Sequence, residues 1–506
     1  MVTVINFGGQ YAHLIARRIR ELGVKSELLP AETSAKEIKK LSPDAIIFSG
    51  SPHSCLERNA PKPDPQIYKL NIPILGICYG HQLMGLQLSG KVKSAKVKQY
   101  GKENLQIKES PLFEGLKNPQ TVWFSHGDQV ESLPIGFKVI ASTKNAGIAA
   151  MEDTLRKFYS VQFHPEVTHT VNGIKVLTNF LFKIAGSKKD WDLPKIKNQI
   201  LKEIKTEIGR QKVIMALSGG VDSLVAATLC QQAIGKNLFC ILIDTGLLRE
   251  NEVEEVKQIA KTTELTNFNV ISEKNRFINN LSGITDPEEK RRKIAGLYFK
   301  VFEEQAKKIG NIMYLTQGTI YPDRVESAST SKHADKIKSH HNVTLPSGLK
   351  LKIVEPLKDL YKDEVRLIGK MLALPEEFVA RHPFPGPALA IRILGEVTDE
   401  RLSILKKADL IFIEELKNFN VYNKVGQAFA ALIPVKTVGV MGDSRTYSYI
   451  IALRSVDTLD FMTADWSKLP QELLEKVSTR IVNEIAGVNR VLYDITQKPP
   501  ATIEYE

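Results

Sequence analysis

The stretch NIPILGICYGHQLMGLQLSG, residues 71–90, decides how the first part of the chain folds. Its first half is a short apolar run of the kind that forms a buried strand, and its second half has leucine and methionine at helical spacing. The halves meet at Cys78, which lies between Gly76 and Gly80. We therefore expect a strand, a tight turn and a helix, with the cysteine at the apex. Backbone N–H groups and a helix N-terminus around such a turn favour the thiolate. The alternative is that Cys78 is a small buried apolar residue.

The composition is that of an ordinary globular chain with several domains. With 506 residues, of which 43% are apolar and 25% charged, the chain has the length of about two to four domains. No apolar run approaches the ~20 residues that cross a bilayer, and the start, MVTVINFGGQ, lacks the features of a signal peptide. The four cysteines have no spacing typical of zinc sites or disulfides. We expect a cytoplasmic protein without membrane contact.

The net charge of +12 fits anionic ligands, either nucleotides or nucleic acid. Much of the positive charge, however, lies in lysine-rich stretches such as KEIKK and KVKSAKVKQYGK. Such stretches are usually solvated faces, so charge alone does not argue for nucleic-acid binding.

Short β-rich runs alternate with amphipathic stretches along most of the chain. The runs VTVINF, DAIIFSG, IPILGI and KFYSVQF are typical of a parallel α/β sheet. A polar linker at 185–195 precedes a second βα series, and a proline-rich segment at 381–389 marks another boundary. We expect two parallel-sheet α/β domains, at residues 1–187 and 188–380, and a small α+β domain at residues 381–506.

A nucleophilic cysteine needs a base, and the base needs a group that orients it. The best candidates lie in KFYSVQFHPEV, where His164 and Glu166 follow an alternating strand. In an extended chain, residues i and i+2 point to the same side, so the carboxylate can orient the imidazole. A His-x-Glu pair alone is a weak signal, but a cysteine turn in the same block strengthens it.

The motifs GICYGHQ, FHPEV, IIFSGSP and SHGDQV resemble those of class I glutamine amidotransferases. The resemblance implies that Cys78 attacks the glutamine carboxamide, that His164 moves the proton and that Glu166 orients it. It also implies an oxyanion hole formed by backbone N–H groups of Tyr79 and the Gly50-Ser51 turn. This family usually has a glycine at the position of Ser51. If that position needs a positive φ, serine has a conformational cost there.

A second candidate site follows the apolar run at 213–217. Glycines let the backbone approach a phosphate closely, and a helix N-terminus supplies free N–H groups. The segment resembles the PP-loop of N-type ATP pyrophosphatases, which implies that it binds ATP; its residues are Ser218, Gly219, Gly220, Val221, Asp222 and Ser223. Asp222 is a candidate ligand of Mg²⁺, because a carboxylate among phosphates needs a cation. Asp244, at the end of the next strand, lies where an α/β sheet would hold the adenosine.

Motifs along the whole chain, among them QGTIYPDRVESA, RHPFPGPALAIR and KPPATIEYE, resemble the glutamine-hydrolysing GMP synthetases. This family makes GMP from XMP, ATP and glutamine and uses Mg²⁺ with the ATP, and no tightly bound organic cofactor is expected. Its last domain forms a homodimer. The resemblance implies XMP contacts from five residues, with Arg291 as the alternative to the first: Arg292, Gln427, Asp443, Lys498 and Glu504. It further implies a lid that carries Lys336, Lys338, His340 and His341.

The chain departs from the family pattern in three further places. The lid continues as TLPSG and not with two glycines, Ala388 replaces a usual glycine, and Leu224 replaces a common serine. The alternative function is that of a PP-loop enzyme that modifies tRNA. That function needs aromatic residues interleaved with basic ones in an RNA-binding extension, and none is found, so nucleic-acid binding is not expected.

Overall fold

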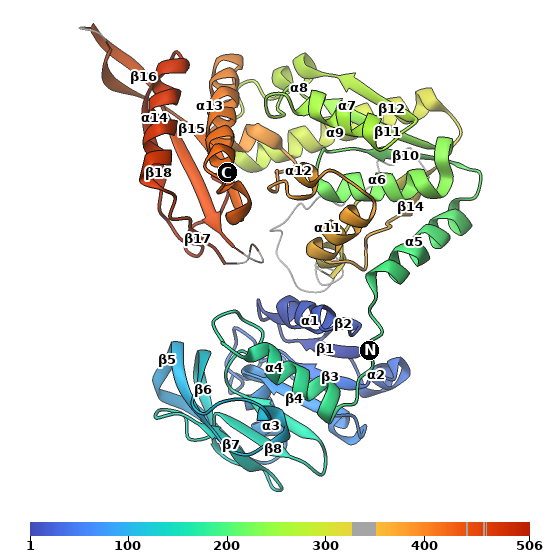
Figure 1. The fold of residues 1–506 in the computed structure, drawn as a ribbon, viewed down its shortest axis with the longest axis vertical. Coiled ribbons are helices and arrows are strands. Elements are labelled where there is room, and N and C mark those ends of the chain that lie inside the picture. The colour runs from blue at the N-terminus through green and yellow to red at the C-terminus, as the bar shows by residue number, and fades with distance from the viewer. Residues whose placement is uncertain (326–350, 442–443, 459–460, 462) are drawn as a thin grey trace. The chain divides into compact units, whose positions relative to one another are not determined.

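The structure is a computed structural model that describes residues 1–325, 351–441, 444–458, 461 and 463–506. The chain forms two compact units, Met1–Asp192 and Leu193–Glu506 (Figure 1). The predicted linker at 185–195 contains the division between them. None of the described helices is long and apolar enough to cross a membrane.

The first unit contains a nine-stranded sheet in the order β2-β1-β3-β4-β9-β8-β7-β5-β6. Its first five strands pair in parallel, which confirms the predicted α/β class. The other four continue the sheet with antiparallel pairs, an extension that the sequence did not predict. The strands are β1 (Val2–Asn6), β2 (Ser26–Pro30), β3 (Ala45–Phe48), β4 (Ile74–Ile77), β5 (Lys91–Ile107), β6 (Gln120–Ser132), β7 (Lys138–Ser142), β8 (Ala150–Asp153) and β9 (Phe158–Val161).

The helices of this unit follow the expected amphipathic pattern. In α1, Leu14, Ile15 and Ile19 are buried on one face, as the helical period requires. The start of α2 is fixed by a capping box between Ser34 and Glu37. The helices are α1 (Ala12–Glu21), α2 (Ala35–Leu41), α3 (Tyr79–Gln87) and α4 (Gly173–Thr178), with short 3₁₀ helices η1 (Pro65–Lys69) and η2 (Pro111–Phe113) and a π-helix η3 (Asn179–Ile184).

The second unit begins with a five-stranded sheet in the order β12-β11-β10-β13-β14, in which all pairs are parallel. This arrangement confirms the second predicted parallel sheet. Its strands are β10 (Lys212–Ala216), β11 (Leu238–Asp244), β12 (Asn267–Ser272), β13 (Ile312–Thr316) and β14 (Lys352–Val354). The accompanying helices are α5 (Leu193–Ile208), α6 (Val221–Ile234), α7 (Glu252–Thr262), α8 (Lys274–Asn280), α9 (Pro287–Ile309), α11 (Lys362–Met371) and α12 (Glu376–Val379), with turns η4 (Gly235–Asn237) and η5 (Ala388–Arg392).

A second, four-stranded sheet ends the described part of this unit. Its long hairpin β15–β16 is antiparallel, and β18 pairs in parallel with β16. This mixture of helices and strands confirms the predicted α+β composition. The elements are α13 (Asp399–Asn418), η6 (Tyr422–Lys424), β15 (Gln427–Met441), β16 (Ser444–Asp457), β17 (Asp465–Trp466), α14 (Gln471–Glu484) and β18 (Val488–Asp494).

One hydrophobic core joins the two sheets of the second unit. It includes Ile214 and Ile241 from the parallel sheet, Leu389 after it, and Phe412 and Leu432 from the C-terminal elements. The segment around residue 380 is therefore not a gap between separate cores. The domain limits at 187/188 and 380/381 stay predictions.

Candidate active sites

Cys78 lies in a tight turn between β4 and α3, as predicted. Its backbone is strained, with φ 54° and ψ −101°, and it precedes the first residue of the helix. The flanking glycines make this turn possible. A Cβ on Gly76 would lie 2.6 Å from the carbonyl oxygen of Gly80, and one on Gly80 would lie 2.5 Å from that of Phe48. The turn thus needs glycine at both positions.

His164 and Glu166 meet beside this cysteine. The Nδ1 atom of His164 lies 2.7 Å from Oε1 of Glu166, and both side chains are almost completely buried. A Cβ on Gly50 would lie 3.3 Å from Cε1 of His164 and 3.9 Å from Cβ of Cys78, so the imidazole and the thiol converge over this glycine. The structure therefore brings Cys78, His164, Glu166 and Gly50 together.

The charge state of the imidazole follows from its neighbours. Burial by itself would lower the pKa of His164, but the charges of Glu166 and Cys78 and the hydrogen bonds to both side chains outweigh burial. They raise the pKa to about 10. A protonated imidazole beside the sulfur favours the thiolate, which is the nucleophilic form.

The backbone around His164 is also fixed. Its carbonyl accepts a hydrogen bond from the hydroxyl of Thr170 at 2.6 Å, and its N–H donates to the carbonyl of Trp123 at 3.0 Å. The ring of Tyr11 packs edge-on against the imidazole at 5.1 Å between centroids. Arg18 donates to the carbonyl of Glu166 at 3.0 Å. These contacts hold the imidazole in one orientation.

The backbone at the predicted oxyanion hole is constrained by Gly9 and by the start of α3. A Cβ on Gly9 would lie 2.3 Å from the carbonyl oxygen of Gly50, so this carbonyl points toward Gly9 and the N–H of Ser51 points the opposite way. Ser51 does not have a positive φ. The conformational cost considered for serine at this position is therefore absent. Tyr79 is the first residue of α3, where N–H groups have no partner within the helix.

The predicted phosphate-binding loop joins β10 to α6, as expected from its glycines. Gly219 has φ 77°, and Gly220 is the N-cap of a helix that begins at Val221. The hydroxyls of Ser218 and Ser223 lie 3.0 Å apart across the turn. No side chain caps the backbone N–H groups at this helix start, as a site for an anion requires.

Asp222 fits the role of a Mg²⁺ ligand. Lys362 lies 3.3 Å from its Oδ2 atom, whereas its Oδ1 atom is buried without a hydrogen-bond partner. An unpartnered buried carboxylate oxygen beside a phosphate site is a suitable oxygen ligand for Mg²⁺. In the part of the chain that the structure describes, no group of three or more metal-ligating side chains exists. A single carboxylate suffices here, because Mg²⁺ takes most other ligands from phosphates and water.

Asp244 ends β11 at the same edge of the parallel sheet. Its Oδ1 atom accepts a hydrogen bond from the N–H of Gly246 at 3.0 Å, and Lys274 lies 3.4 Å from its Oδ2 atom. Lys274 also lines a surface pocket with its neighbours in residues 272–276. Asp244 itself is not among the residues that line this pocket.

Two of the predicted XMP contacts lie together. The side-chain amide of Gln427 donates to Oε1 of Glu504 at 2.7 Å. Lys498 lies nearby in sequence, but its amine donates to the carbonyl of Phe461 at 2.6 Å. Asp443 and the predicted lid residues lie outside the described residues.

The structure distinguishes the two candidate arginines of α9. The side chain of Arg292 is 77% exposed and its ion pair is with Glu289 of the same helix. Arg291 instead donates to the backbone carbonyl of Glu506 at 2.6 Å. The geometry therefore brings Arg291, the alternative, and not the preferred Arg292, to the segment that carries Glu504.

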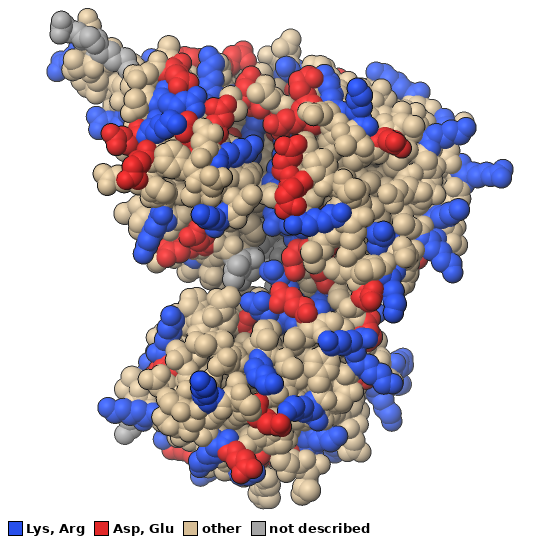
Figure 2. Space-filling model, in the orientation of Figure 1, with Lys and Arg blue, Asp and Glu red and all other residues tan. Residues whose placement is uncertain are grey.

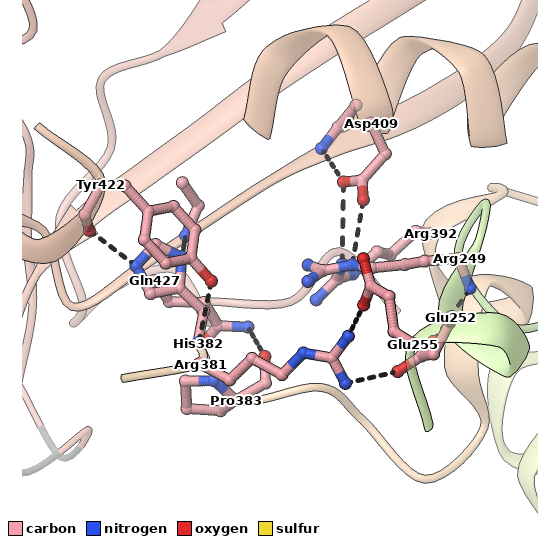
Figure 3. A network of polar contacts seen from close by, with 12 residues as sticks. Arg249, Glu252, Glu255, Arg381, His382, Pro383, Arg392, Asp409, Tyr422 and Gln427 are labelled. Carbon is pink, nitrogen blue, oxygen red and sulfur yellow. Dashed lines mark hydrogen bonds and ion pairs between the residues drawn. The ribbon is translucent and has the colours of Figure 1, made fainter. Parts of the chain in front are cut away.

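A network around three arginines, of which Arg392 is buried and Arg249 and Arg381 are partly buried, was missed by the sequence analysis (Figure 3). Arg392 donates twice to Glu504, at 2.8 and 2.9 Å, and Arg249 lies 2.9 Å from Asp409. Arg381 donates to the carbonyl of Gly219 in the phosphate loop at 3.0 Å. The signal was present in RHPFPGPALAIR, where two arginines flank an apolar, proline-rich segment. Arginine in such a segment needs a buried anionic or carbonyl partner.

Comparison with known proteins agrees with this division of sites. The family model described as class I glutamine amidotransferase matches residues 3–184, and the model described as NAD synthase matches residues 193–293. The model of the GMP synthase C-terminal domain matches residues 414–505. The fold and the sites therefore define a class I glutamine amidotransferase joined to an ATP pyrophosphatase of the NAD synthase type.

Relatives that match the whole length of the chain identify the family within this class. A protein of Carboxydothermus hydrogenoformans named GMP synthase (glutamine-hydrolyzing) is 54% identical over 507 residues, which cover 100% of this chain and 99% of the relative. Proteins of the same name from Thermosipho melanesiensis and Aquifex aeolicus are 53% and 52% identical, with the same coverage. The chain belongs to the glutamine-hydrolysing GMP synthases.

Proposed function

We propose that the two units divide the work of GMP synthesis: the first releases ammonia from glutamine, and the second activates XMP with ATP. The overall activity, conversion of XMP to GMP with the amide nitrogen of glutamine, is that of the family. It is a carbon–nitrogen ligase reaction that uses ATP. The convergence of thiol, imidazole and carboxylate over Gly50 supports this assignment of the first unit most strongly.

In the first unit, the thiolate of Cys78 attacks the carboxamide carbon of glutamine. The C–N bond breaks, and His164 gives a proton to the leaving ammonia. Glu166 holds the imidazole in place, and the N–H groups of Tyr79 and Ser51 stabilise the oxyanion. Water, deprotonated by His164, then attacks the glutamyl thioester, and glutamate leaves as the thiol forms again.

In the second unit, O2 of XMP attacks the α-phosphorus of ATP and pyrophosphate leaves. Ammonia then displaces AMP from the adenylylated ring, and GMP forms. The loop from Ser218 to Ser223 binds the phosphates through backbone N–H groups and hydroxyls. Asp222 would hold Mg²⁺, which supplies positive charge next to the phosphates when it is bound. We place adenosine beside Asp244.

We propose that Gln427, Glu504 and Lys498 contact XMP, together with Asp443. Of the two arginines on α9, Arg291 is better supported than Arg292, because it contacts Glu506, two residues after Glu504. We also propose that the chain acts as a homodimer through its C-terminal elements. The four free, buried cysteines fit a cytoplasmic enzyme.

The face drawn in Figure 2 gives no support to the tRNA-modifying alternative. On the face drawn in Figure 2, lysine and arginine side chains are interspersed with aspartate and glutamate on both units. An RNA-binding face would need a contiguous basic stripe that follows the phosphates.

The Cys78→Ala variant tests the division of labour. We expect loss of GMP formation from glutamine, while GMP formation from ammonium stays close to the wild-type rate, because the thiol serves only the release of ammonia. The measurement compares both nitrogen sources at saturating XMP and ATP. Cys55→Ala, which removes another buried thiol of the same unit, is the matched control and should keep both activities. Equal loss of both activities in Cys78→Ala would mean that this cysteine is structural.

A further inference from the structure

The last four residues, which we call the tail (503–506), have two kinds of partners in alternation. Ile503 and Tyr505 pack into an apolar cluster with Phe429, Ala431 and Val456. Glu504 and Glu506 instead contact side chains of earlier segments. The tail is therefore held on one side by apolar packing and on the other by two carboxylates.

Each carboxylate meets a completely buried cation. Arg392 has no exposed side-chain surface and binds both oxygens of Glu504. The guanidinium also lies 4.0 Å from the ring centre of Phe429. Such an enclosed charge has no access to water, so it depends on its carboxylate.

Lys290 forms the second of these pairs. Its side chain is also completely buried, and its amine contacts Glu506 and the carbonyls of Ala390 and Ile393, the latter at 2.7 Å. The other oxygen of Glu506 accepts a hydrogen bond from the N–H of Gly395 at 2.8 Å. Burial lowers the pKa of Lys290, and the charge of Glu506 opposes this effect. Neither member of the pair is therefore easily removed alone.

The ion pair with Arg392 leaves the side chain of Glu504 with little conformational freedom. A carboxylate accepts about four hydrogen bonds, and three come from Arg392 and Gln427. The side chain is still 20% exposed. About one acceptor position on a fixed carboxylate thus remains for a donor from outside.

We propose that Arg392 and Lys290 are positioning residues of the XMP site, which seat the tail so that Glu504 presents this remaining acceptor to XMP. The inference rests on the proposed contact between Glu504 and XMP. Lys290 acts through Glu506 and the tail, and it does not touch the substrate.

The Lys290–Glu506 pair tests this proposal without a change to Glu504. We expect Lys290→Met to speed hydrogen exchange of the amides of residues 501–506, because the buried carboxylate loses its partner. We also expect the KM for XMP to rise roughly tenfold or more, with little change in kcat or in the KM for ATP. The double variant Lys290→Met with Glu506→Met replaces the ion pair by apolar side chains and should restore most of the protection and the KM. Lys293→Met, an exposed lysine of the same helix, is the control and should change neither measurement.

The two measurements separate the inference from the proposed function. Unchanged exchange in Lys290→Met would overturn the seating of the tail by this pair, whatever the kinetics show. Faster exchange with an unchanged KM for XMP would support the conclusion that this pair seats the tail, but it would overturn the role of Glu504 in XMP binding. If Lys290→Met does not fold, the double variant carries the test: slow exchange and normal kinetics would support the pairing, and fast exchange would contradict it.

Discussion

The chemistry proposed for the first unit depends most directly on His164. It lies between a carboxylate 2.7 Å away and the thiol of Cys78, and all three side chains are almost completely buried. In such surroundings the carboxylate favours the protonated imidazole, and the protonated imidazole favours the thiolate. The reactivity of the cysteine is therefore set two side chains away, at Glu166.

Replacement of Glu166 tests whether its carboxylate sets the charge of His164 and, through it, the reactivity of Cys78. In Glu166→Gln the shape stays similar, but the charge that raises the pKa of His164 is lost, so the imidazole becomes neutral at a lower pH. We expect alkylation of Cys78 by iodoacetamide at pH 7 to slow by roughly ten- to hundredfold, since a hydrogen bond to a charged group contributes ~1.5–3 kcal/mol. The variant Glu152→Gln, at another buried carboxylate of the unit, controls for general damage. Alkylation as fast as in the wild type would show that Glu166 does not set the charge of the imidazole.

The sequence predicted contacts between residues that are near each other along the chain, and failed where orientation decides. The spacing of His164 and Glu166 was enough to predict their hydrogen bond. The choice between Arg291 and Arg292 was not possible from spacing, because one residue turns the side chain by about 100° around a helix. Arg392 was missed because its partner Glu504 lies 112 residues away.

At the scale of elements, the first residue of η5, Ala388, differs from the family pattern, and we expect its backbone conformation to affect the free energy of unfolding. Ala388 has φ 55°, a backbone conformation that favours glycine, and glycine is the residue that the family pattern has there. The left-handed conformation costs an alanine ~1–2 kcal/mol. The methyl group is buried in the main core of the unit, where it regains ~0.8 kcal/mol.

We therefore expect Ala388→Gly to be nearly neutral, because relief of the backbone conformation offsets the lost methyl group and the greater flexibility of the unfolded chain. Ala226→Gly, at a fully buried position inside α6, is the matched comparison. It should destabilise by ~2 kcal/mol, since the helix loses ~1 kcal/mol of propensity in addition to the methyl group. The denaturant midpoint of the second unit gives both values. Similar losses in the two variants would contradict the strain assigned to Ala388.

Elements with apolar runs were predictable, and elements with polar surfaces were not. The strands β1, β3, β4 and β9 were recognised because both of their faces are buried. The stretch KVKSAKVKQYGK was interpreted as a solvated face, and it is part of β5. Most of its side chains are indeed at least partly exposed, so the apolar alternation that reveals a half-buried strand is absent.

For the whole molecule, buried neutral histidines link stability to pH. Burial lowers the pKa of His81 to about 3, and burial lowers that of His126 and of His382 to about 4. In the unfolded chain these groups titrate near pH 6.5. Below that pH the unfolded state binds more protons than the folded state, so stability falls as the pH falls.

The two units should differ in this respect, because His81 and His126 belong to the first unit and His382 to the second. Each histidine costs up to ~1.4 kcal/mol per pH unit below about pH 6.5. Between pH 6.5 and 5, we expect the melting temperature of the first unit to fall more steeply. Thermal unfolding recorded by calorimetry at several pH values, with His81→Gln as the comparison, measures the slopes. A flat profile down to pH 5 would contradict the neutral state of these histidines.

The single core that connects the two sheets of the second unit also limits how the gene can be divided. If the gene were divided into two separate genes between the codons of Asp192 and Leu193, each polypeptide would keep its own hydrophobic core intact. A division near codon 380 would separate Ile214 from Phe412 and Leu432, and both products would expose apolar surface that is buried in the intact unit. Such products would tend to aggregate before they could associate. We therefore expect that the gene can be split between codons 192 and 193 but not near codon 380.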